Sequence, residues 1–464
     1  MIFTAYIFKI YAEQNQEHYG KEGQQSMKRL LKNVAEPNLF REIFSYDKIP
    51  AFKLDGKTIT PRLPDHFWIT DTTFRDGQQA RPPYTVEEIV QLFKFMHRIG
   101  GERGVIRQSE FFLYGEQDRK AVEACQELGF EFPQITAWIR AVKKDFELVK
   151  AMGLKETGIL TSCSDYHIFL KLRKTRRQAL DTYKEIVEAA LENGVRPRCH
   201  LEDATRADFE GFVIPMINEL NALCAGSGTS VKIRLCDTMG YGLPFPNVPV
   251  PRGIPAMLDM ILTETDTTSE QLEWHGHNDF HKVLANGVCA WLYGCSAVNG
   301  TFLGFGERTG NPPIEGLVFD WMGLTGINDG IDTTAITEMA EFFRTQIKHT
   351  IPPNYPFVGA DFNTTRAGIH ADGLTKNEEI YNIFDTEKFL KRPCKVAVSN
   401  TSGLAGIAYW VQENTPKGAE IRKDNPGIIA IRDWIDAEYA RGRTTTISDN
   451  EMLEQVRLHL PGLL

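Results

Sequence analysis

Two histidines two residues apart mark the chain as a candidate metal-binding protein. His275 and His277 lie in the run QLEWHGHND, which has the composition of a strand. Because alternate residues of a strand point to the same face, both imidazoles would converge on one point. Such a pair suits a divalent metal, but a hydrogen-bonded pair in a protein core would show the same spacing. A carboxylate from a second element is needed to favour the metal.

A carboxylate of this kind lies in the run ITDTTFRDGQQ, residues 69–79, which begins as a strand-like segment and ends in polar residues. Asp76 could supply one oxygen ligand, and Asn311, in the run GERTGN, could supply a second. Two imidazoles, a carboxylate and an amide oxygen describe an octahedral site with positions left for water or substrate, which Mn²⁺, Mg²⁺, Co²⁺ or Zn²⁺ can fill. Arg75, beside Asp76, could pair with a substrate carboxylate or stabilise a developing oxyanion.

Two further strand ends carry polar side chains. HLEDATRAD ends a strand with Glu202, to which we assign proton transfer, and with Asp203, to which we assign the capping of the next helix. In CDTMGYG the hydroxyl of Thr238 could bind a carboxylate or cap a turn, and the sequence favours neither. The basic run KLRKTRR, residues 171–177, is typical of a solvated helix start, with the docking of a phosphate-bearing cofactor as the alternative.

These residues need a scaffold that brings strand ends together. From residue 67 onward a short β-prone run, a polar loop and an amphipathic helical stretch recur. Eight such units predict a (β/α)8 TIM barrel, whose active site lies at the carboxyl ends of the strands. A doubly wound open sheet is the alternative, disfavoured because no GxGxxG turn follows any run. The eight runs are 67–71, 104–112, 133–139, 156–162, 196–202, 232–237, 271–277 and 295–304.

The pattern also divides the chain. We expect the barrel over residues 65–325 and, because helical and loop patterns follow it, a mainly helical C-terminal region over residues 326–464. Residues 1–64 look like an arm packed on the barrel. Within it, residues 1–26 look like an upstream extension, since the run from Met27 is a more usual cytosolic start than a signal peptide.

Composition limits the class of protein. The net charge of −9 argues against a nucleic-acid partner, and no stretch approaches the ~18 apolar residues of a membrane helix. The eight cysteines are scattered without a CxxC pair, which is typical of reduced thiols in a cytoplasmic protein. The sequence therefore favours an ordinary cytoplasmic enzyme or binding protein for small molecules.

Taken in order, the motifs resemble those of the metal-dependent enzymes that condense or cleave acyl-CoA on a TIM barrel. This family includes 2-isopropylmalate synthase, homocitrate synthase and 3-hydroxy-3-methylglutaryl-CoA lyase. The motifs are DTTFRDGQQ, TSCSDYHIFLKLRKT, RCHLEDATRAD, RLCDTMGYG, HGHND, GFGERTGN and AGIHADGLTKN. Each is weak alone, but the ordered set is specific. The likeness covers about residues 65–320 and a patch near 360–385.

The resemblance implies a metal site, a site that binds the 2-oxo acid and an acetyl-CoA site. Among the divalent metals we expect Mn²⁺. The positions that correspond to the family's metal ligands are Asp76, His275, His277 and Asn311. Arg75 and Thr238 correspond to residues that hold the 2-oxo acid, and Glu202 to the acidic catalytic residue. His370, joined by Tyr381, resembles the histidine that the helical region contributes to the acetyl-CoA site of the partner subunit. We therefore expect a homodimer with exchanged C-terminal subdomains.

Departures from the family pattern bear on the substrate. Gln78 stands where the family usually has Glu, and our alignment places Gln108 where it has an acid, so the pocket wall would lose negative charge. Arg107 or Arg140 would suit a second carboxylate. We expect Gln79, Gln108 and Arg140 to contact the substrate, a dicarboxylic 2-oxo acid such as oxaloacetate.

The expected reaction is the condensation of acetyl-CoA with this acid, followed by hydrolysis of the thioester. 2-Oxoglutarate, as in homocitrate synthase, and 2-oxoisovalerate, as in 2-isopropylmalate synthase, are the alternative substrates. The non-enzyme alternative is a metal-binding barrel that has lost catalysis. The presence of Arg75, Asp76, His275 and Glu202 together argues against it.

Overall fold

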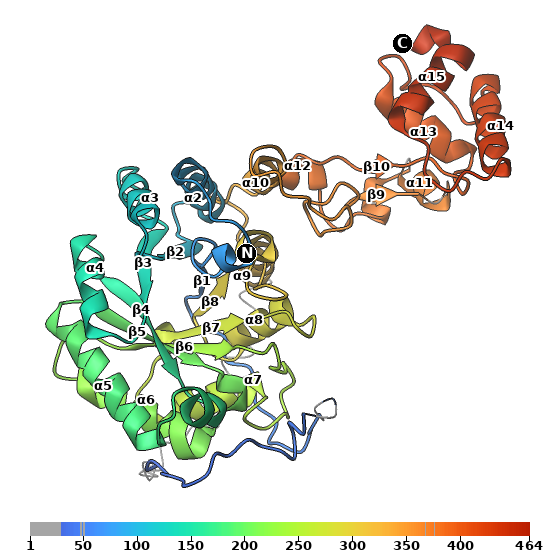
Figure 1. Cartoon of the computed structure of the whole chain (residues 1–464). Helices are drawn as coiled ribbons and strands as arrows, with labels where there is room; N and C mark the ends of the chain where they lie inside the picture. The colour runs from blue at the N-terminus through green and yellow to red at the C-terminus, as the bar shows by residue number, and fades with distance from the viewer. Residues whose placement is uncertain (1–28, 47–48, 50–51, 367, 375) are drawn as a thin grey trace.

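Eight parallel strands close into a barrel in the described part of the chain, which comprises residues 29–46, 49, 52–366, 368–374 and 376–464 of this computed structural model (Figure 1). Each strand pairs with the next along the chain, and β8 pairs with β1 to close the sheet. Every barrel strand falls within one of the eight predicted runs, so the predicted (β/α)8 barrel is confirmed. The strands are β1 Trp68–Asp71, β2 Ile106–Phe111, β3 Gln134–Ile139, β4 Glu156–Ser162, β5 Arg196–Glu202, β6 Lys232–Asp237, β7 Leu272–Gly276 and β8 Ala297–Gly300.

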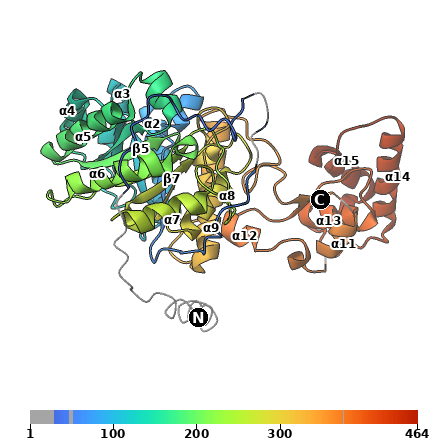
Figure 2. The ribbon, with the colours of Figure 1, turned by 90° about the horizontal axis from the view of Figure 1, so that it is seen from below.

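A helix follows each barrel strand and lies on the outside of the sheet (Figures 1 and 2). Helix α2 illustrates the cause, because Leu92, Met96 and Ile99 recur at helical spacing and are fully buried. Thr85 and Glu88 form a capping box at its start. In the described ranges, no helix is both long and apolar enough to cross a membrane. These helices are α2 Val86–Gly100, α3 Glu116–Gln126, α4 Phe146–Ala151, α5 Arg176–Glu192, α6 Ile214–Cys224, α7 Ile254–Glu264, α8 Val283–Leu292 and α9 Ile314–Thr325.

Short 3₁₀ and π-helical turns link several of these elements. One of them, the π-helical turn η3, follows β4 and lies at the carboxyl end of the barrel, where π turns often accompany functional sites. The turns are η1 Gly77–Ala80, η2 Lys143–Asp145, η3 Tyr166–Lys171, η4 Ala204–Arg206, η5 Phe209–Val213, η6 Ser269–Gln271, η7 Phe302–Gly304, η8 Glu378–Ile380 and η9 Pro461–Leu463.

The described residues between 29 and 64 form an arm that is hydrogen-bonded to the barrel at several points. The amide of Asn38 donates to Asp165 beyond β4, and the amide of Ile59 donates to the carbonyl of Pro246 beyond β6. The amide of Arg62 then bonds to the end of α8. The predicted upstream extension, residues 1–26, lies outside the described residues.

The barrel unit extends beyond the predicted boundary at residue 325. Helix α10 (Thr334–Thr345) packs on α2, and its residues Ile336, Met339 and Phe343 belong to the same apolar core as the barrel helices. The sequence pattern changes after residue 325, but the barrel core continues beyond α10, because Ile351, Val358 and Leu390 also belong to it.

The last three α-helices build a second core that both ribbon views show standing away from the barrel (Figures 1 and 2). Ile407, Ile431 and Val456 are fully buried in this core, one from each of these helices. Leu390, at the end of the short helix that packs on α10, belongs to the barrel core instead. The elements that follow α10 are β9 Thr364–Thr365, α11 Gly368–Leu374, α12 Thr386–Leu390, β10 Lys395–Val396, α13 Leu404–Asn414, α14 Pro426–Ala440 and α15 Asp449–His459, with β9 and β10 paired in a small parallel sheet.

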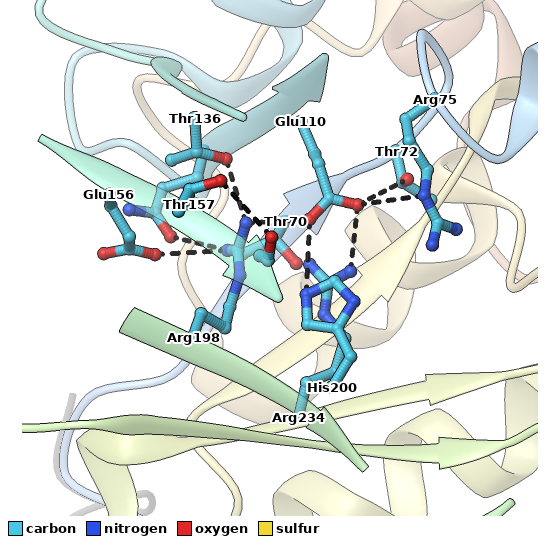
Figure 3. Close-up of polar contacts among 12 residues, drawn as sticks. Thr70, Thr72, Arg75, Glu110, Thr136, Glu156, Thr157, Arg198, His200 and Arg234 are labelled. Atoms are coloured by element: carbon cyan, nitrogen blue, oxygen red, sulfur yellow. Dashed lines mark hydrogen bonds and ion pairs between the residues drawn. The ribbon is translucent and has the colours of Figure 1, made fainter. Parts of the chain in front are cut away.

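Charged side chains, rather than apolar ones, fill the interior of the barrel below the strand ends. Arg198 of β5 and Arg234 of β6 reach toward Glu110 of β2, as Figure 3 shows, and all three are 1% exposed. Arg198 donates to Glu110 over 2.9 Å and Arg234 over 3.0 Å. Arg234 also donates to Glu273 over 2.8 and 3.0 Å, and Arg198 lies 3.2 Å from Glu156. Because an unpaired buried charge is costly, each charge of this layer depends on its neighbours.

Replacing Arg234 by methionine should destabilise the barrel by about 3–5 kcal/mol, because Glu273 and Glu110 each lose a close buried partner. Urea unfolding followed by tryptophan fluorescence measures the change. The matched control is Arg177→Met on α5, where the side chain is 43% exposed and pairs with Glu219 over 3.2 Å. That exposed pair should contribute less than about 1 kcal/mol. Equal losses in the two variants would contradict the role given to the buried layer.

Candidate active site

A small cavity of about 200 Å³ opens at the carboxyl ends of the strands. Seven of the residues predicted for the site line it, namely Arg75, Asp76, Gln79, Glu202, Thr238, His275 and His277. The other lining residues are Trp138, Leu160, His200, Arg234, Cys236, Glu307 and Arg308. A larger cavity of about 630 Å³ lies at the opposite end of the barrel, where parallel barrels carry stability rather than chemistry.

The predicted metal ligands converge. One ligand atom from each of Asp76, His275 and His277 lies within 4.8 Å of the others, and the three residues are buried. The two Nε2 atoms of the histidines are 3.3 Å apart. Oxygen Oδ2 of Asp76 is buried and has no hydrogen-bond partner among the described residues. A buried carboxylate oxygen without a partner is costly unless a cation or a donor occupies the space it faces.

The protonation states suit a cation. Asn299 donates through Nδ2 to Thr70, so its Oδ1 faces Nδ1 of His275 at 2.8 Å and holds the proton on that nitrogen. The lone pair of Nε2 is then directed at the cluster. Burial lowers the pKa of His275 to about 3, which keeps the imidazole neutral. Burial raises the pKa of Asp76, but the charge of Arg75 holds it below its ordinary value, so the carboxylate is charged.

Asn311 lies beside this cluster with its amide oriented. Its Nδ2 donates to the carbonyl of Gly276 over 2.9 Å, and its Oδ1 is buried with no partner among the described residues. The turn that carries it depends on Gly306, because a Cβ there would lie 2.0 Å from that oxygen. Two imidazole nitrogens, a carboxylate oxygen and an amide oxygen therefore fit an octahedral Mn²⁺, Mg²⁺, Co²⁺ or Zn²⁺ with coordination positions to spare.

Arg75 is held against the cluster from three sides. Its Nη1 donates to Asp76 over 2.9 Å, and its guanidinium lies 4.8 Å from the centre of the Trp138 ring. Its Nε is 3.6 Å from Glu110, which is too long for a hydrogen bond. This arrangement leaves part of a fixed planar guanidinium to meet an anion in the cavity.

Gln108 is not in the pocket, and the prediction that it replaces a pocket acid is wrong. Its Oε1 accepts from Lys232 over 3.2 Å and from Arg198 over 3.4 Å, which places it below the charged layer. Glu110, two residues further along β2, occupies the level next to Arg75. The two residues share a strand face, and only the stagger of the barrel decides which one reaches the site.

Gln78 does not alter the charge of the pocket either. Its Nε2 donates to the carbonyl of Phe74 over 2.6 Å, and its Oε1 accepts from the amide of Tyr84 over 3.0 Å. An amide can make both bonds, whereas a carboxylate cannot donate one. Gln78 therefore braces the loop, and the sequence argument from lost negative charge fails at both positions.

Arg140 points away from the site, contrary to prediction. It follows the last residue of β3, its side chain is 62% exposed, and it donates to Asp145 over 3.0 Å. Arg107, the other predicted candidate, stacks on Trp68 with its guanidinium 4.6 Å from the ring centre. The arginines that line the cavity are Arg75, Arg234 and Arg308.

Glu202 lines the mouth as an anion. Lys171 of η3 donates to it over 3.0 Å, and Nδ1 of His167 lies 3.0 Å from it. Burial raises the pKa of Glu202, but the hydrogen bonds from His167 and Ser162 and the charge of Lys171 together lower it to about 2. A carboxylate held so strongly in its charged form is a weak base near neutral pH.

Two local predictions around Glu202 need correction. Asp203 makes no side-chain capping bond to η4 but accepts from Arg206 over 2.9 Å and from Ser164 over 2.5 Å. The run 171–177 is not uniformly solvated, because Arg176 is fully buried and donates to Asp165 over 2.7 Å. Both side chains found partners distant in sequence that the local pattern does not reveal.

Thr238 and Arg308 meet at the rim of the cavity. The amide of Asp203 donates to Oγ1 of Thr238 over 2.8 Å, so the hydroxyl is anchored while its own proton remains available. Arg308 donates to the carbonyl of Thr238 and to Asp279 over 2.8 Å. Gln79 lies exposed at the same rim on η1.

His370 and Tyr381 do not reach this cavity in the same chain. Their rings lie 4.5 Å apart, and both residues are exposed. Helix α11, which carries His370, stands apart from the barrel in both ribbon views (Figures 1 and 2). The structure therefore separates them from Glu202 and the metal cluster.

The sequence left open whether Gln108 or Glu110 faces the site, and sequence reasoning missed Trp138, His200, Arg234 and Arg308. The first three of these lie inside strands, and the period of two together with the pairing of neighbouring strands finds them. His200 is two residues before Glu202, Trp138 two before Arg140, and Arg234 is aligned with His200 on the next strand. Strand interiors, and not only strand ends, supply this pocket.

The chain is similar to known proteins over most of its length. The family profile described as HMGL-like matches residues 66–343. A Citrate (Re)-synthase from Syntrophus aciditrophicus is 55% identical over 93% of this chain and 69% of its own length. A Citrate (Re)-synthase from Clostridium kluyveri is 50% identical over 94% of this chain and 96% of its own length. The solved structure of hydroxymethylglutaryl-CoA lyase from Pseudomonas aeruginosa matches with a TM-score of 0.50 at 18% identity, over 62% of this chain and 95% of that one, which supports the fold alone.

The replacement Asn299→Ala should lower the affinity for Mn²⁺ by about 10–100-fold, because His275 loses the acceptor that fixes its tautomer and ring orientation. Calorimetric titration with Mn²⁺ measures the affinity. The matched control is Asn286→Ala, which removes a buried amide of α8 that donates to the carbonyl of Gly242 over 3.1 Å. Wild-type affinity in the Asn299 variant would contradict the metal site.

Proposed function

The chain belongs to the HMGL-like family, and we propose that it is an acyltransferase that condenses acetyl-CoA with oxaloacetate to give citrate and CoA. The observation that carries this proposal is the convergence of Asp76, His275 and His277 beside Arg75 in one small cavity. The two relatives named Citrate (Re)-synthase, which match nearly the whole chain, support the same reaction.

Four residues would hold the metal, for which we favour Mn²⁺. Asp76, His275, His277 and Asn311 offer the ligand atoms: Oδ2 of Asp76 and Oδ1 of Asn311 have no hydrogen-bond partner among the described residues, and the two histidine Nε2 atoms face only each other. When bound, a divalent cation supplies a Lewis acid that draws electron density from a ketone oxygen. Co²⁺, Mg²⁺ and Zn²⁺ suit the same donors.

The cavity selects an anionic 2-oxo acid through the groups that remain able to donate. Arg75 presents a fixed guanidinium that can pair with a carboxylate and stabilise negative charge on the ketone oxygen as the new bond forms. Thr238 can donate its hydroxyl proton to the same carboxylate, and Gln79 lies at the rim. Arg234 also lines the inner end of the cavity, but Glu273 and Glu110 already accept its hydrogen bonds, so Arg75 is the arginine left to meet a carboxylate there.

Proton transfer needs a second residue besides Glu202, because the ion pair with Lys171 makes this carboxylate a weak base. We assign the removal of the methyl proton of acetyl-CoA to His370 of a second copy, with Tyr381 beside it and Glu202 stabilising the imidazolium. The carbanion then attacks the ketone carbon, and water cleaves the thioester to release CoA. His370 and Tyr381 are exposed and lie away from their own barrel, which supports a homodimer with exchanged C-terminal regions.

Purified protein with Mn²⁺ and acetyl-CoA should release free thiol with oxaloacetate and form citrate. The assay uses a panel of 2-oxo acids that includes 2-oxoglutarate and 2-oxoisovalerate. Chelation of the metal and the replacement His275→Ala should each reduce thiol release by at least about 1,000-fold, since both remove the carbonyl activation. Preference for another acid would overturn the substrate, and the absence of thiol release with every acid would favour the non-enzyme alternative.

Mixing two inactive variants tests the exchanged dimer. In a dimer of His275→Ala and His370→Ala chains, one of the two sites combines an intact metal centre with an intact His370. After denaturation and joint refolding, random pairing should restore roughly a quarter of wild-type activity. The control is a mixture of His275→Ala with His277→Ala, whose defects lie in the same barrel and should restore nothing. Equal behaviour of the two mixtures would contradict the exchange.

A further inference from the structure

His200 and Arg234 lie at the inner end of the active-site cavity, and the reaction above assigns no role to His200. On β5 three alternate residues face the barrel interior at successive depths. Glu202 lies at the mouth with Lys171, and Arg198 lies in the charged layer and does not line the cavity. His200 lies between them, is 2% exposed and does line the cavity. On this strand it therefore lies between the mouth of the cavity and Arg198; Figure 3 shows its imidazole beside Glu110 and Arg234.

The imidazole of His200 makes little contribution to the charged layer. Its Nε2 is 3.5 Å from Oε2 of Glu110, and it has no hydrogen-bond partner among the described residues. The same oxygen of Glu110 already accepts from Arg198 over 2.9 Å. Burial together with the nearby Arg234 and Arg198 holds the pKa of His200 well below its ordinary value, so the ring is neutral. Removal of the ring therefore leaves every charge of the layer with its partner.

A glycine on the neighbouring strand sets the position of this ring. A Cβ at Gly158 of β4 would lie 2.5 Å from Nε2 of His200 and 3.0 Å from Oε2 of Glu110. Real Cβ atoms do not approach so closely, so any side chain at this position would displace the imidazole. The absence of a side chain at Gly158 thus leaves the space that the imidazole of His200 fills, and the two residues together determine where the cavity ends.

We propose that His200 is a specificity-determining residue that limits the length of the 2-oxo acid, so that the four-carbon dicarboxylate fits and the acid longer by one methylene does not. This inference rests on the proposed function and adds the reason for the choice between oxaloacetate and 2-oxoglutarate. The cavity measures only about 200 Å³, and its inner end is a rigid ring backed by a layer of paired charges. An extra methylene would have to displace that ring. Because protein interiors are closely packed, such a clash has no easy relief.

The test replaces His200 by alanine and by asparagine and compares the two acids in the thiol-release assay. The ratio of kcat/KM for oxaloacetate to kcat/KM for 2-oxoglutarate should fall by at least about 10-fold in His200→Ala, and by less in His200→Asn, since one methylene in a pocket is worth about 10–200-fold. Calorimetric affinities of the two acids for the Mn²⁺-loaded protein should change in the same direction. A ring with a structural role only would lower both kcat/KM values together and leave the ratio unchanged, and that result overturns the inference.

Cys199→Ala is the matched control, because Cys199 is the neighbouring residue on β5, is fully buried and faces the helices. It should leave the ratio at the wild-type value. A change of ratio in this variant as large as in His200→Ala would also overturn the inference, because it would trace the effect to a general disturbance of the strand.

A second variant decides the matter if the His200 variants do not fold. Gly158→Ala should push the imidazole into the cavity and raise KM for oxaloacetate by about 10-fold or more while the affinity for Mn²⁺ stays unchanged. An unchanged KM would overturn the inference. Failure of the proposed function can be told apart from failure of this inference, because in the former case the wild-type protein would prefer another 2-oxo acid of the panel. The His200 variants should still shift that preference toward the acid one methylene longer.

Discussion

The paired charges around Glu110 are the interaction on which the rest of the structure depends. This carboxylate accepts from Arg198 and Arg234 across the inside of the barrel, at a depth where all three are 1% exposed. Taking three charges out of water is costly, and only their mutual pairing and the further bonds to Glu273 and Glu156 offset it. At this depth the barrel interior therefore holds a layer of paired charges instead of the layers of branched apolar side chains usual in such barrels.

The residues of the active-site cavity lie next to this charged layer, on the strands that carry it or on the loops that follow them. Arg75 lies 3.6 Å from the same Glu110, and His200 rests against it from the next interior level of β5. The side chains at the level of the predicted metal ligands are not paired in this way. Asp76, His275 and Asn311 direct ligand atoms at a shared space instead of accepting hydrogen bonds from one another. Paired charges below and acceptor atoms without partners above are what a site needs if a bound cation or substrate is to supply the missing partners.

The sequence predicted the barrel and the convergence of Asp76, His275 and His277 correctly, and the reason is that both follow from the period of the strands and their order along the chain. The strands alternate with helices in a closed parallel sheet, and the i, i+2 spacing of His275 and His277 places them on one face wherever the strand lies. Predictions that depended on long-range contacts failed. Gln108, expected in the pocket because it aligns with an acid of the family, lies below the charged layer, and Arg140, expected there as a partner for a second carboxylate, turns outward to Asp145.

The sequence by itself determined which residues share a strand face and in which order the strands follow one another, because those properties depend on the backbone period and on chain connectivity. Only the tertiary structure decided the depth of each residue inside the barrel, since the stagger between neighbouring strands sets which of Gln108 and Glu110 meets Arg75 and whether His200 borders the cavity. It also placed His370 away from its own barrel, because the C-terminal helices bury a separate core and carry α11 with them.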